Sequence, residues 1–475
     1  MDRKQRDNQF RKRWTRTVRN IKFVTFFGFL IVMGLIGLLW FARPTESAVE
    51  KRTLAEFPKL TWSSFWDGSF FSGVETWYAD TYPLRESLIS MNTSLQSLYG
   101  IRTTQIVGDT NVPAADEIPT GDVEIPINTA PEPEDQQPAD TEPVDEEPAP
   151  EEEGPAEGEH DITAPLEMAG SIYIADNCGF GLYYFNQDSA VRYCSYVNTL
   201  YQNLDGASDL YVLLAPISAG VLLDESVLEA AGASDENEAT EWIYSQLTEG
   251  VKTVSVYNTL KRNNGDYIYF HTDHHWTALG AYYAYQEFCK EKGISPHQLT
   301  DFKTMEFEGF LGTFYSNSGK SPELGANPDT VTAYIPNGTN TVDTYMKVNG
   351  TWSSYQWPIV NDVSDYAKSE LYATFAAGDQ PFNYAHNEQI TDGSSVCVVK
   401  NSYGNAFIPF LVDHYEHIYW IDFRYYQDYC AYAGEANNTI STFAKANGID
   451  DIILLTDISA TGNEVLLDPM QKVFQ

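Results

Sequence analysis

The sequence predicts an α/β fold in which a buried parallel sheet carries helices on both faces. Beyond residue 166, apolar runs alternate with stretches long enough to form helices. Several runs are continuously apolar, which is typical of strands buried on both faces of a parallel sheet. A doubly wound arrangement of this kind places a ligand site at the carboxyl ends of its strands. The predicted strands are 172–175, 210–215, 254–257, 267–270, 396–399, 418–421 and 452–455.

The first 42 residues predict one transmembrane helix ahead of this fold. Residues 1–22 hold nine Lys and Arg against two Asp, and residues 23–42 carry no charge. A helix of that length crosses a bilayer, and the apolar run exceeds the roughly 7–15 residues of a signal-peptide core. We therefore predict a cytoplasmic tail (1–22), a single-pass anchor (23–42) in a bacterial plasma membrane, and an extracytoplasmic remainder.

The composition changes twice between the anchor and the predicted sheet. Residues 43–108 are rich in aromatic side chains and include helical apolar spacing at 88–99, so we predict a piece that packs on the main domain. Residues 109–165 are rich in Pro, Glu, Ala and Asp, which predicts a disordered acidic linker. Residues 166–475 then form the predicted catalytic domain.

Composition also excludes several classes of function. The net charge is −38, and 19 of the 67 acidic residues lie in 109–161. The remainder is still acidic, which argues against nucleic-acid binding, because phosphate contacts need a basic face. The five cysteines show no C-x-x-C spacing, so a zinc ribbon is unsupported, and their odd number leaves at least one free thiol. We expect no cofactor and no bound metal.

The segment His-Thr-Asp-His-His-Trp-Thr at 271–277 concentrates acid–base groups directly after a predicted strand. If that strand continues, His271, Asp273 and His275 share one face and His274 lies on the other. Asp273 could then orient His275 as a general base. Alternatively, His271, Asp273 and His275 (or His274) could bind a metal ion, or the cluster could only satisfy its own hydrogen bonds.

A second loop supplies a candidate nucleophile. Ser402 follows the predicted strand 396–399 and precedes a helical stretch. A serine there lies near the backbone N–H groups of a helix start, which can form an oxyanion hole, although serine is also a common helix cap. Both loops can lie at one edge of the sheet, which favours a triad of Ser402, His275 and Asp273 over a metal site that leaves Ser402 unused.

The motif Thr-Asp-His-His-Trp-Thr at 272–277, with Gly-Ala-Tyr-Tyr at 280–283, resembles the signature of the DHHW family. The resemblance covers nearly everything outside the tail, the anchor and the acidic linker, which is then an insertion. The family is similar to the SGNH-hydrolase-like domains of alginate O-acetyltransferases, which use a D-x-H pair and a distant serine. Further blocks agree in order at 49–58, 80–85, 170–174, 309–316, 375–380, 400–410 and 421–426.

This resemblance implies an SGNH-hydrolase-like, flavodoxin-like fold and assigns the triad to Ser402, His275 and Asp273. It also implies transfer of an acyl group, usually acetyl, to hydroxyls of an exported polysaccharide. Such proteins often work beside a multi-pass membrane-bound O-acyltransferase. We therefore expect a membrane-anchored O-acetyltransferase. The alternatives are a carbohydrate esterase with the same triad, a non-catalytic glycan-binding or scaffold protein, and a metal hydrolase on His271, Asp273 and His274.

Two positions depart from the family pattern. Asn401 stands where we expect an aspartate before the serine, and Ala377-Gly378-Asp379 stands where we expect Gly-Gly-Asn. If the family asparagine is an oxyanion donor, Asp379 could replace it only when protonated, because an ionised carboxylate only accepts hydrogen bonds.

Four residues are candidates for substrate binding: Trp276, Tyr403, Arg424 and Asp379. Trp276 is expected to form a wall of the site. Arg424 could bind an anionic sugar or the acyl carbonyl, or could instead pair with Asp422. In this interpretation His274 is structural and His271 is a bystander.

Overall fold

The computed structural model describes the folded region almost completely. The predicted tail, the anchor, the helix at 88–99 and most of the acidic linker lie outside the described residues. No helix among the described residues is long and apolar enough to cross a bilayer. The described residues are 43, 46–47, 52–53, 57–60, 62, 69–83, 115–121, 123, 125–126, 158, 160–348, 351–434 and 438–475.

The chain divides into two units, 1–103 and 104–475. In the first, β1 (Glu46–Ser47) pairs antiparallel with β2 (Arg52–Thr53), and α3 spans Ser69–Asp80. The Arg43 guanidinium lies 4.0 Å from the Trp77 ring centroid. That this unit packs on the main domain stays a prediction.

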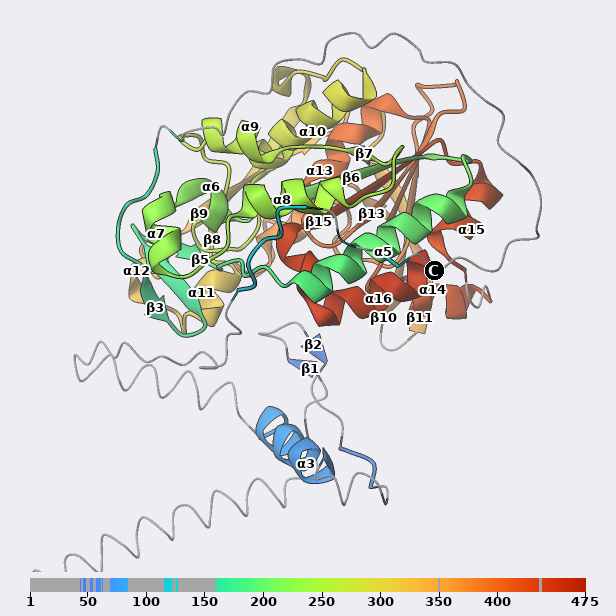
Figure 1. The fold of residues 1–475 in the computed structure, drawn as a ribbon. Coiled ribbons are helices and arrows are strands. Elements are labelled where there is room, and N and C mark those ends of the chain that lie inside the picture. The colour runs from blue at the N-terminus through green and yellow to red at the C-terminus, as the bar shows by residue number, and fades with distance from the viewer. Residues whose placement is uncertain are drawn as a thin grey trace, which may run out of the picture. The chain divides into compact units, whose positions relative to one another are not determined.

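A large mixed sheet forms the core of the second unit (Figure 1). In the described part of the chain it has eight strands in the order β11-β10-β12-β14-β13-β15-β6-β7. The last five are mutually parallel, as predicted, and every residue of β13 and β15 is buried. They span Asp209–Ala215 (β6), Lys252–Thr253 (β7), Ser395–Lys400 (β13), His417–Asp422 (β14) and Asp451–Asp457 (β15).

The prediction of a wholly parallel sheet is wrong for the other three strands. β12 (Asn383–His386) pairs antiparallel with both β14 and β10, and β10 (Thr341–Val348) pairs antiparallel with β11 (Thr351–Pro358). β10 and β11 expose much of their length, so they lack the continuous apolar runs by which buried strands were identified.

Three other predicted strands also differ. Residues Ile172–Ala175 form β4 in a separate antiparallel sheet with β3 (Glu167–Ala169) and β5 (Cys178–Phe180). The run at 254–257 is largely the connection from β7 to helix α9 (Tyr257–Arg262). The run at 267–270 forms no strand, only an isolated bridge between Tyr269 and Trp276. A further antiparallel pair joins β8 (Lys303–Phe310) and β9 (Asp329–Ile335).

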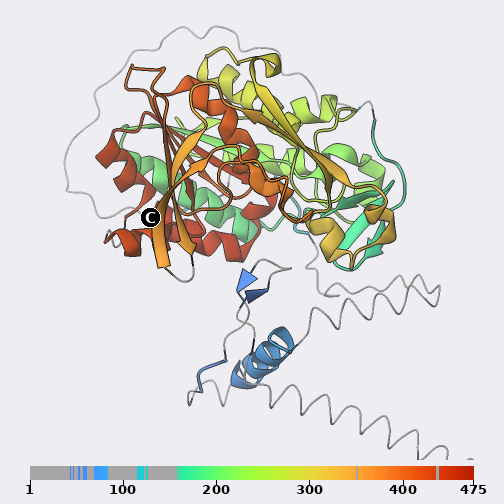
Figure 2. The same cartoon turned by 180° about the vertical axis from the view of Figure 1, so that it is seen from behind.

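Helices cover both faces of the central sheet, as predicted. Figures 1 and 2 show α10 and α13 on one face and α5, α15 and α16 on the other. These helices span Gln187–Leu204 (α5), Ala278–Lys292 (α10), Gly404–Leu411 (α13), Ile440–Asn447 (α15) and Glu464–Phe474 (α16). The shorter ones span Ser218–Leu222 (α6), Glu225–Ala230 (α7), Glu236–Ser245 (α8), Thr313–Asn317 (α11), Pro322–Gly325 (α12) and Tyr426–Ala433 (α14). All five cysteines lie in the described residues as buried free thiols.

Candidate active site

The structure brings together the three residues of the predicted triad, although His275 and Ser402 are 127 positions apart in the sequence. His275 Nδ1 lies 2.6 Å from Asp273 Oδ1, and His275 Nε2 lies 2.8 Å from Ser402 Oγ. The side chains of Asp273 and His275 are 3% and 7% exposed, so water screens their interaction little. The carboxylate, the imidazole and the hydroxyl form one continuous hydrogen-bonded chain.

The His271–Thr277 segment is a loop, not the end of a strand, so the expected alternation of faces is wrong. Its shape depends on Asp329 of β9, which accepts the backbone N–H groups of His271 and Thr272, each at 2.8 Å. Asp273 reaches His275 within a turn, because its Oδ1 also accepts the His275 backbone N–H at 3.1 Å. Thr277 then caps α10 by accepting the N–H of Gly280.

Thr313 holds the other oxygen of Asp273. Its backbone N–H donates to Asp273 Oδ2 at 2.7 Å and its hydroxyl at 3.0 Å. Burial alone raises the pKa of Asp273, but the neighbouring imidazoles of His274 and His275 and these hydrogen bonds outweigh it and keep the pKa below its ordinary value. Gly312 is required beside it, because a Cβ there would lie 2.2 Å from Asp273 Oδ2. Thr313 was not identified from the sequence, although it lies in the family block at 309–316.

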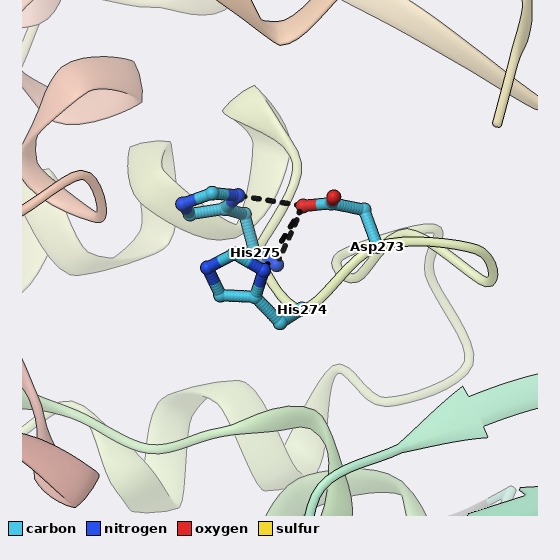
Figure 3. Close-up of side chains that lie close together, drawn as sticks. All are labelled: Asp273, His274 and His275. Carbon is cyan, nitrogen blue, oxygen red and sulfur yellow. Dashed lines mark hydrogen bonds and ion pairs between the residues drawn. The ribbon is translucent and has the colours of Figure 1, made fainter. Parts of the chain in front are cut away.

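His274 is not on the opposite face. Figure 3 shows both imidazole rings on the same side of the Asp273 carboxylate, and the two ring centroids are 3.8 Å apart. His274 Nδ1 lies 2.7 Å from Thr313 Oγ1 and 3.7 Å from Asp273 Oδ1. His271 is turned toward Asp329, with 3.3 Å between its Nδ1 and Oδ1 of that residue.

The donor atoms of Asp273, His274 and His275 lie within 4.8 Å of one another, so we tested whether they fit a metal. Two ligand atoms on a tetrahedral zinc ion are separated by about 3.4 Å, given bonds of about 2.0–2.1 Å. The 2.6 Å between Asp273 Oδ1 and His275 Nδ1 is instead a hydrogen-bond distance, and His275 Nε2 is directed at Ser402. These residues fit an acid–base pair better than a metal site.

Ser402 lies at the carboxyl end of β13, immediately before α13, as predicted. Asn401 shapes this turn, because its Oδ1 accepts the Tyr403 N–H at 3.1 Å and its amide donates to Asp457 Oδ2 at 2.6 Å. An aspartate at 401 would place two carboxylates against each other. The presence of Asp457 therefore explains why an asparagine fits at 401, where the family pattern has an aspartate.

The N–H groups at the start of α13 are not the free donors that we expected. Gly404 donates to the carbonyl of Asn401 at 3.1 Å, and Asn405 donates to that of Ser402 at 3.2 Å. Within the described residues, the backbone N–H of Ser402 has no acceptor, so it is the donor left at this turn for a developing oxyanion.

Tyr372 is a site residue that the sequence did not reveal. It lies in a 3₁₀ turn (Leu371–Thr374), and its ring stacks on His275 with centroids 3.9 Å apart and planes 9° apart. Its hydroxyl donates to the Ser402 carbonyl at 3.0 Å. Tyr372 therefore orients both the base and the nucleophile loop. Its position in a short turn outside every recognised block gave no signal.

A cluster of charges adjoins this turn and decides the state of Asp379. Arg424 Nη2 lies 3.0 Å from Asp379 and 2.5 Å from Asp422, and the buried Lys400 lies 3.6 Å from Asp379. Burial alone raises the pKa of Asp379, but the charges of Arg424 and Lys400 outweigh it and hold the pKa below its ordinary value. Ionised Asp379 accepts from Asn405 Nδ2 at 2.8 Å. It cannot be an oxyanion donor, and Arg424 is engaged in ion pairs.

Trp276, expected to form a wall of the site, and Tyr403, expected to bind substrate, both lie away from solvent. Both side chains are fully buried, and Trp276 Nε1 donates to the Tyr403 carbonyl at 2.9 Å. The Tyr403 hydroxyl donates to the His274 carbonyl at 2.5 Å. These two hydrogen bonds join the loop of His275 to the loop of Ser402, which helps to fix the distance between base and nucleophile.

The loop before Asp379 has an uncommon backbone. Ala376, Ala377 and Gly378 all have left-handed φ angles, of 52°, 58° and 77°. Such a conformation costs about 1–3 kcal/mol for each non-glycine residue and concentrates at functional sites. Trp420 Nε1 holds this loop by donating to the Ala376 carbonyl at 3.1 Å.

Comparisons with known proteins identify the family and the fold. A family model described as DHHW protein matches residues 50–129 and 152–421. A crystal structure of a DHHW family protein from Eubacterium siraeum is 28% identical, with 67% of this chain and 98% of that chain covered and a TM-score of 0.54. No curated protein matches the chain in sequence.

Two more distant solved structures were also matched. PatB1 from Bacillus cereus, solved with a sulfonyl adduct, is 18% identical over 62% of this chain and 98% of its own, with a TM-score of 0.50, which indicates a shared fold alone. The O-acetyltransferase domain of AlgJ from Pseudomonas putida is 12% identical over 66% of this chain and 84% of its own. Its TM-score of 0.29 is too low to support an inference.

Proposed function

Because this chain belongs to the DHHW family, we propose that it is a serine O-acyltransferase that modifies an exported cell-surface polysaccharide. The observation that carries the proposal is the hydrogen-bonded chain from Asp273 through His275 to Ser402. The same division of labour among a serine, a histidine and a carboxylate recurs on unrelated folds. The choice of a polysaccharide as acceptor and of acetyl as the transferred group rests on the motif resemblance at 272–277 and 400–410.

In the proposed reaction, Ser402 Oγ attacks the carbonyl carbon of an acyl donor. His275 Nε2 takes the hydroxyl proton, while Nδ1–H donates to ionised Asp273, which stabilises the imidazolium that forms. The Ser402 N–H donates to the oxyanion of the tetrahedral intermediate. His275 then protonates the leaving group, and an acyl ester remains on Ser402. A sugar hydroxyl, deprotonated by the same imidazole, attacks that ester and regenerates the serine.

The cellular setting is part of the proposal. A helix at 23–42 would anchor the chain in the plasma membrane, with the triad on the outer side. A multi-pass membrane-bound O-acyltransferase would then supply the acyl group from within. Recovery of the expressed chain in the membrane fraction would support this placement. Protease added outside the cell should then cleave the part of the chain beyond residue 43.

An esterase would use the same triad, with water in place of the sugar hydroxyl. The two activities separate by measurement of both products from one chromogenic acetyl ester. The transferase proposal expects acetylated oligosaccharide to accumulate at the expense of free acetate when an acceptor is added. Acetate release that is unchanged by any acceptor would favour the esterase.

The test of the triad uses full-length chain purified in detergent, with Ser402→Ala beside Ser364→Ala, an exposed serine whose hydroxyl bonds Asp362 and no triad residue. Ser402→Ala is expected to lose ester turnover by about 10⁴-fold or more, and Ser364→Ala to retain it. Parent-level turnover in Ser402→Ala would overturn the proposal.

A further inference from the structure

A second group of histidine and carboxylate side chains lies on the antiparallel part of the central sheet. His386 ends β12 and His417 begins β14, and the two are direct cross-strand partners. Their side chains therefore share one face of the sheet, and the rings stack with centroids 5.1 Å apart. Glu416 immediately precedes His417. Nothing in the proposed acyl transfer uses these three residues.

The spacing of their donor atoms suits a single metal ion. Glu416 Oε1 lies 3.6 Å from His386 Nε2 and 3.7 Å from His417 Nε2, and all three atoms lie within 4.8 Å of one another. Ligand atoms on a tetrahedral zinc ion are about 3.4 Å apart. Only a small side-chain adjustment separates this group from that geometry. These distances fall within the range of ion pairs but are too long for hydrogen bonds, so no hydrogen bond links Glu416 Oε1 to either imidazole.

The neighbours of the group leave the coordinating atoms available. His417 Nδ1 lies 2.9 Å from the Tyr384 hydroxyl, and an N–H on Nδ1 that donates to this oxygen leaves the Nε2 lone pair for a metal. Glu416 Oε2 accepts the Gly393 N–H at 2.7 Å, which leaves Oε1 directed at the histidines. Supporting contacts of this kind orient the ligands of metal sites.

The group is also accessible and lies in a negative field. The side chains of His386 and His417 are 43% and 33% exposed, so an ion can enter from solvent. His386 lines a surface cavity of about 320 Å³, whose other lining residues include the carboxylates of Asp343 and Glu388. Negative charge around the cavity favours a cation over an anion.

We propose that His386, Glu416 and His417 bind one zinc ion, with the fourth coordination position open to water or an oxygen ligand. Two imidazoles and one carboxylate form an ordinary zinc ligand set, and a fourth open position is typical of sites that exchange ligands. The ion would bridge β12 and β14. This inference does not depend on the triad.

The test is a titration of full-length, chelator-treated chain in detergent with Zn²⁺, followed by calorimetry and by metal analysis after dialysis. The parent chain is expected to bind one zinc ion. His386→Ala combined with His417→Ala is expected to lose it, since loss of ligands exceeds the 10–100-fold cost of removing a supporting contact. Tyr384→Phe, which removes only the supporting hydroxyl, is expected to weaken zinc binding by about tenfold.

His160→Ala, at an exposed histidine outside both clusters, is the matched control and is expected to bind as the parent does. Circular dichroism confirms that each variant is folded, and Co²⁺ replaces Zn²⁺ for a visible absorption spectrum of the bound ion. No zinc bound by the parent, or equal stoichiometry and affinity in the double variant, would overturn the proposal.

Discussion

Two clusters of one carboxylate and two histidines, Asp273-His274-His275 and His386-Glu416-His417, have opposite arrangements in the described part of this chain. In the first, the carboxylate and the imidazole of His275 are buried and 2.6 Å apart, and the other ring nitrogen is directed at a serine. In the second, the side chains are partly exposed, and Glu416 Oε1 lies 3.6 Å and 3.7 Å from the nitrogens of the two histidines.

Residue type alone therefore does not select between acid–base chemistry and metal binding, whereas distance and burial distinguish the two clusters. A short contact between a buried carboxylate and imidazole favours a hydrogen bond between them, because water screens the two groups little and no ion fits between them. A wider, wetter spacing leaves room for a cation. Variants that alter one cluster should therefore leave the function of the other intact.

The largest effect is expected from Asp273→Asn, which removes the negative charge of the first cluster but keeps the shape of the side chain. An amide at 273 no longer stabilises the imidazolium of His275, and the catalytic tautomer is disfavoured. In a serine protease triad the same change lowers kcat about 10⁴-fold. We expect a loss of that order in ester turnover by steady-state kinetics, with zinc binding at the second cluster unchanged. A loss below tenfold would contradict the role given to Asp273.

A smaller loss is expected from Gly312→Ala. The new Cβ would meet Asp273 Oδ2 at 2.2 Å, so the carboxylate must shift from the position in which it bonds His275. A displacement of about 1 Å in a catalytic group can cost about 10²-fold in rate. Turnover and thermal unfolding should be measured together, because a folded variant with normal turnover would show that the position of Asp273 is not critical.

Tyr372→Phe should reduce turnover by less than tenfold, because it removes only the hydrogen bond to the Ser402 carbonyl and keeps the stacked ring. Tyr372→Leu removes both and should cost more. If His275 is held by its bond to Asp273 alone, the two variants will be indistinguishable in a KM and kcat comparison.

A histidine outside both clusters gives the smallest effect and sharpens the contrast. Burial, with the nearby His297, lowers the pKa of His414 to about 4. Unfolded chains bind a proton at this residue below about pH 6.5, and the folded chain does not until about pH 4. The contribution of neutral His414 to the free energy of unfolding is therefore fully present above pH 6.5 and is lost as the pH falls toward 4.

This contribution should be on the order of 1–2 kcal/mol, discounted for the partial exposure of His414. His414→Gln keeps an acceptor for the Tyr285 hydroxyl, which lies 2.6 Å from His414 Nε2, but has no ionisable group. Its melting temperature should fall less than that of the parent between pH 6.5 and 4.5. Parallel curves for the two proteins would contradict this assignment.

Much of the fold was readable from continuous apolar runs, and the misses have physical causes. The strands β6, β13 and β15 were identified because nearly all of their residues are buried on both faces, and β14 because its second half is buried. The antiparallel strands β10 and β11 were missed, because their exposed side chains do not form apolar runs. Residues 268–270 of the predicted strand at 267–270 are buried but form no strand, because burial constrains polarity and not backbone conformation.

The site shows the same division between what motifs encode and what tertiary contacts add. Asp273, His275 and Ser402 were selected correctly as neighbours, although the strand argument used for the first two is wrong. The roles expected for His274, Trp276 and Asp379 depended on which way each side chain points. Those directions are set by Thr313, Tyr403 and Arg424, which lie far from them in sequence and could not be paired from one sequence.

The most direct test of the central claim is the site of covalent labelling by a serine-reactive fluorophosphonate. Intact-mass and peptide analysis of the full-length chain should show one adduct, on Ser402. Asp273→Asn should slow its formation strongly, Ser402→Ala should abolish it, and Ser364→Ala should leave it unchanged. A parent chain that is not labelled, or an adduct that persists in Ser402→Ala, would contradict an activated nucleophile at Ser402.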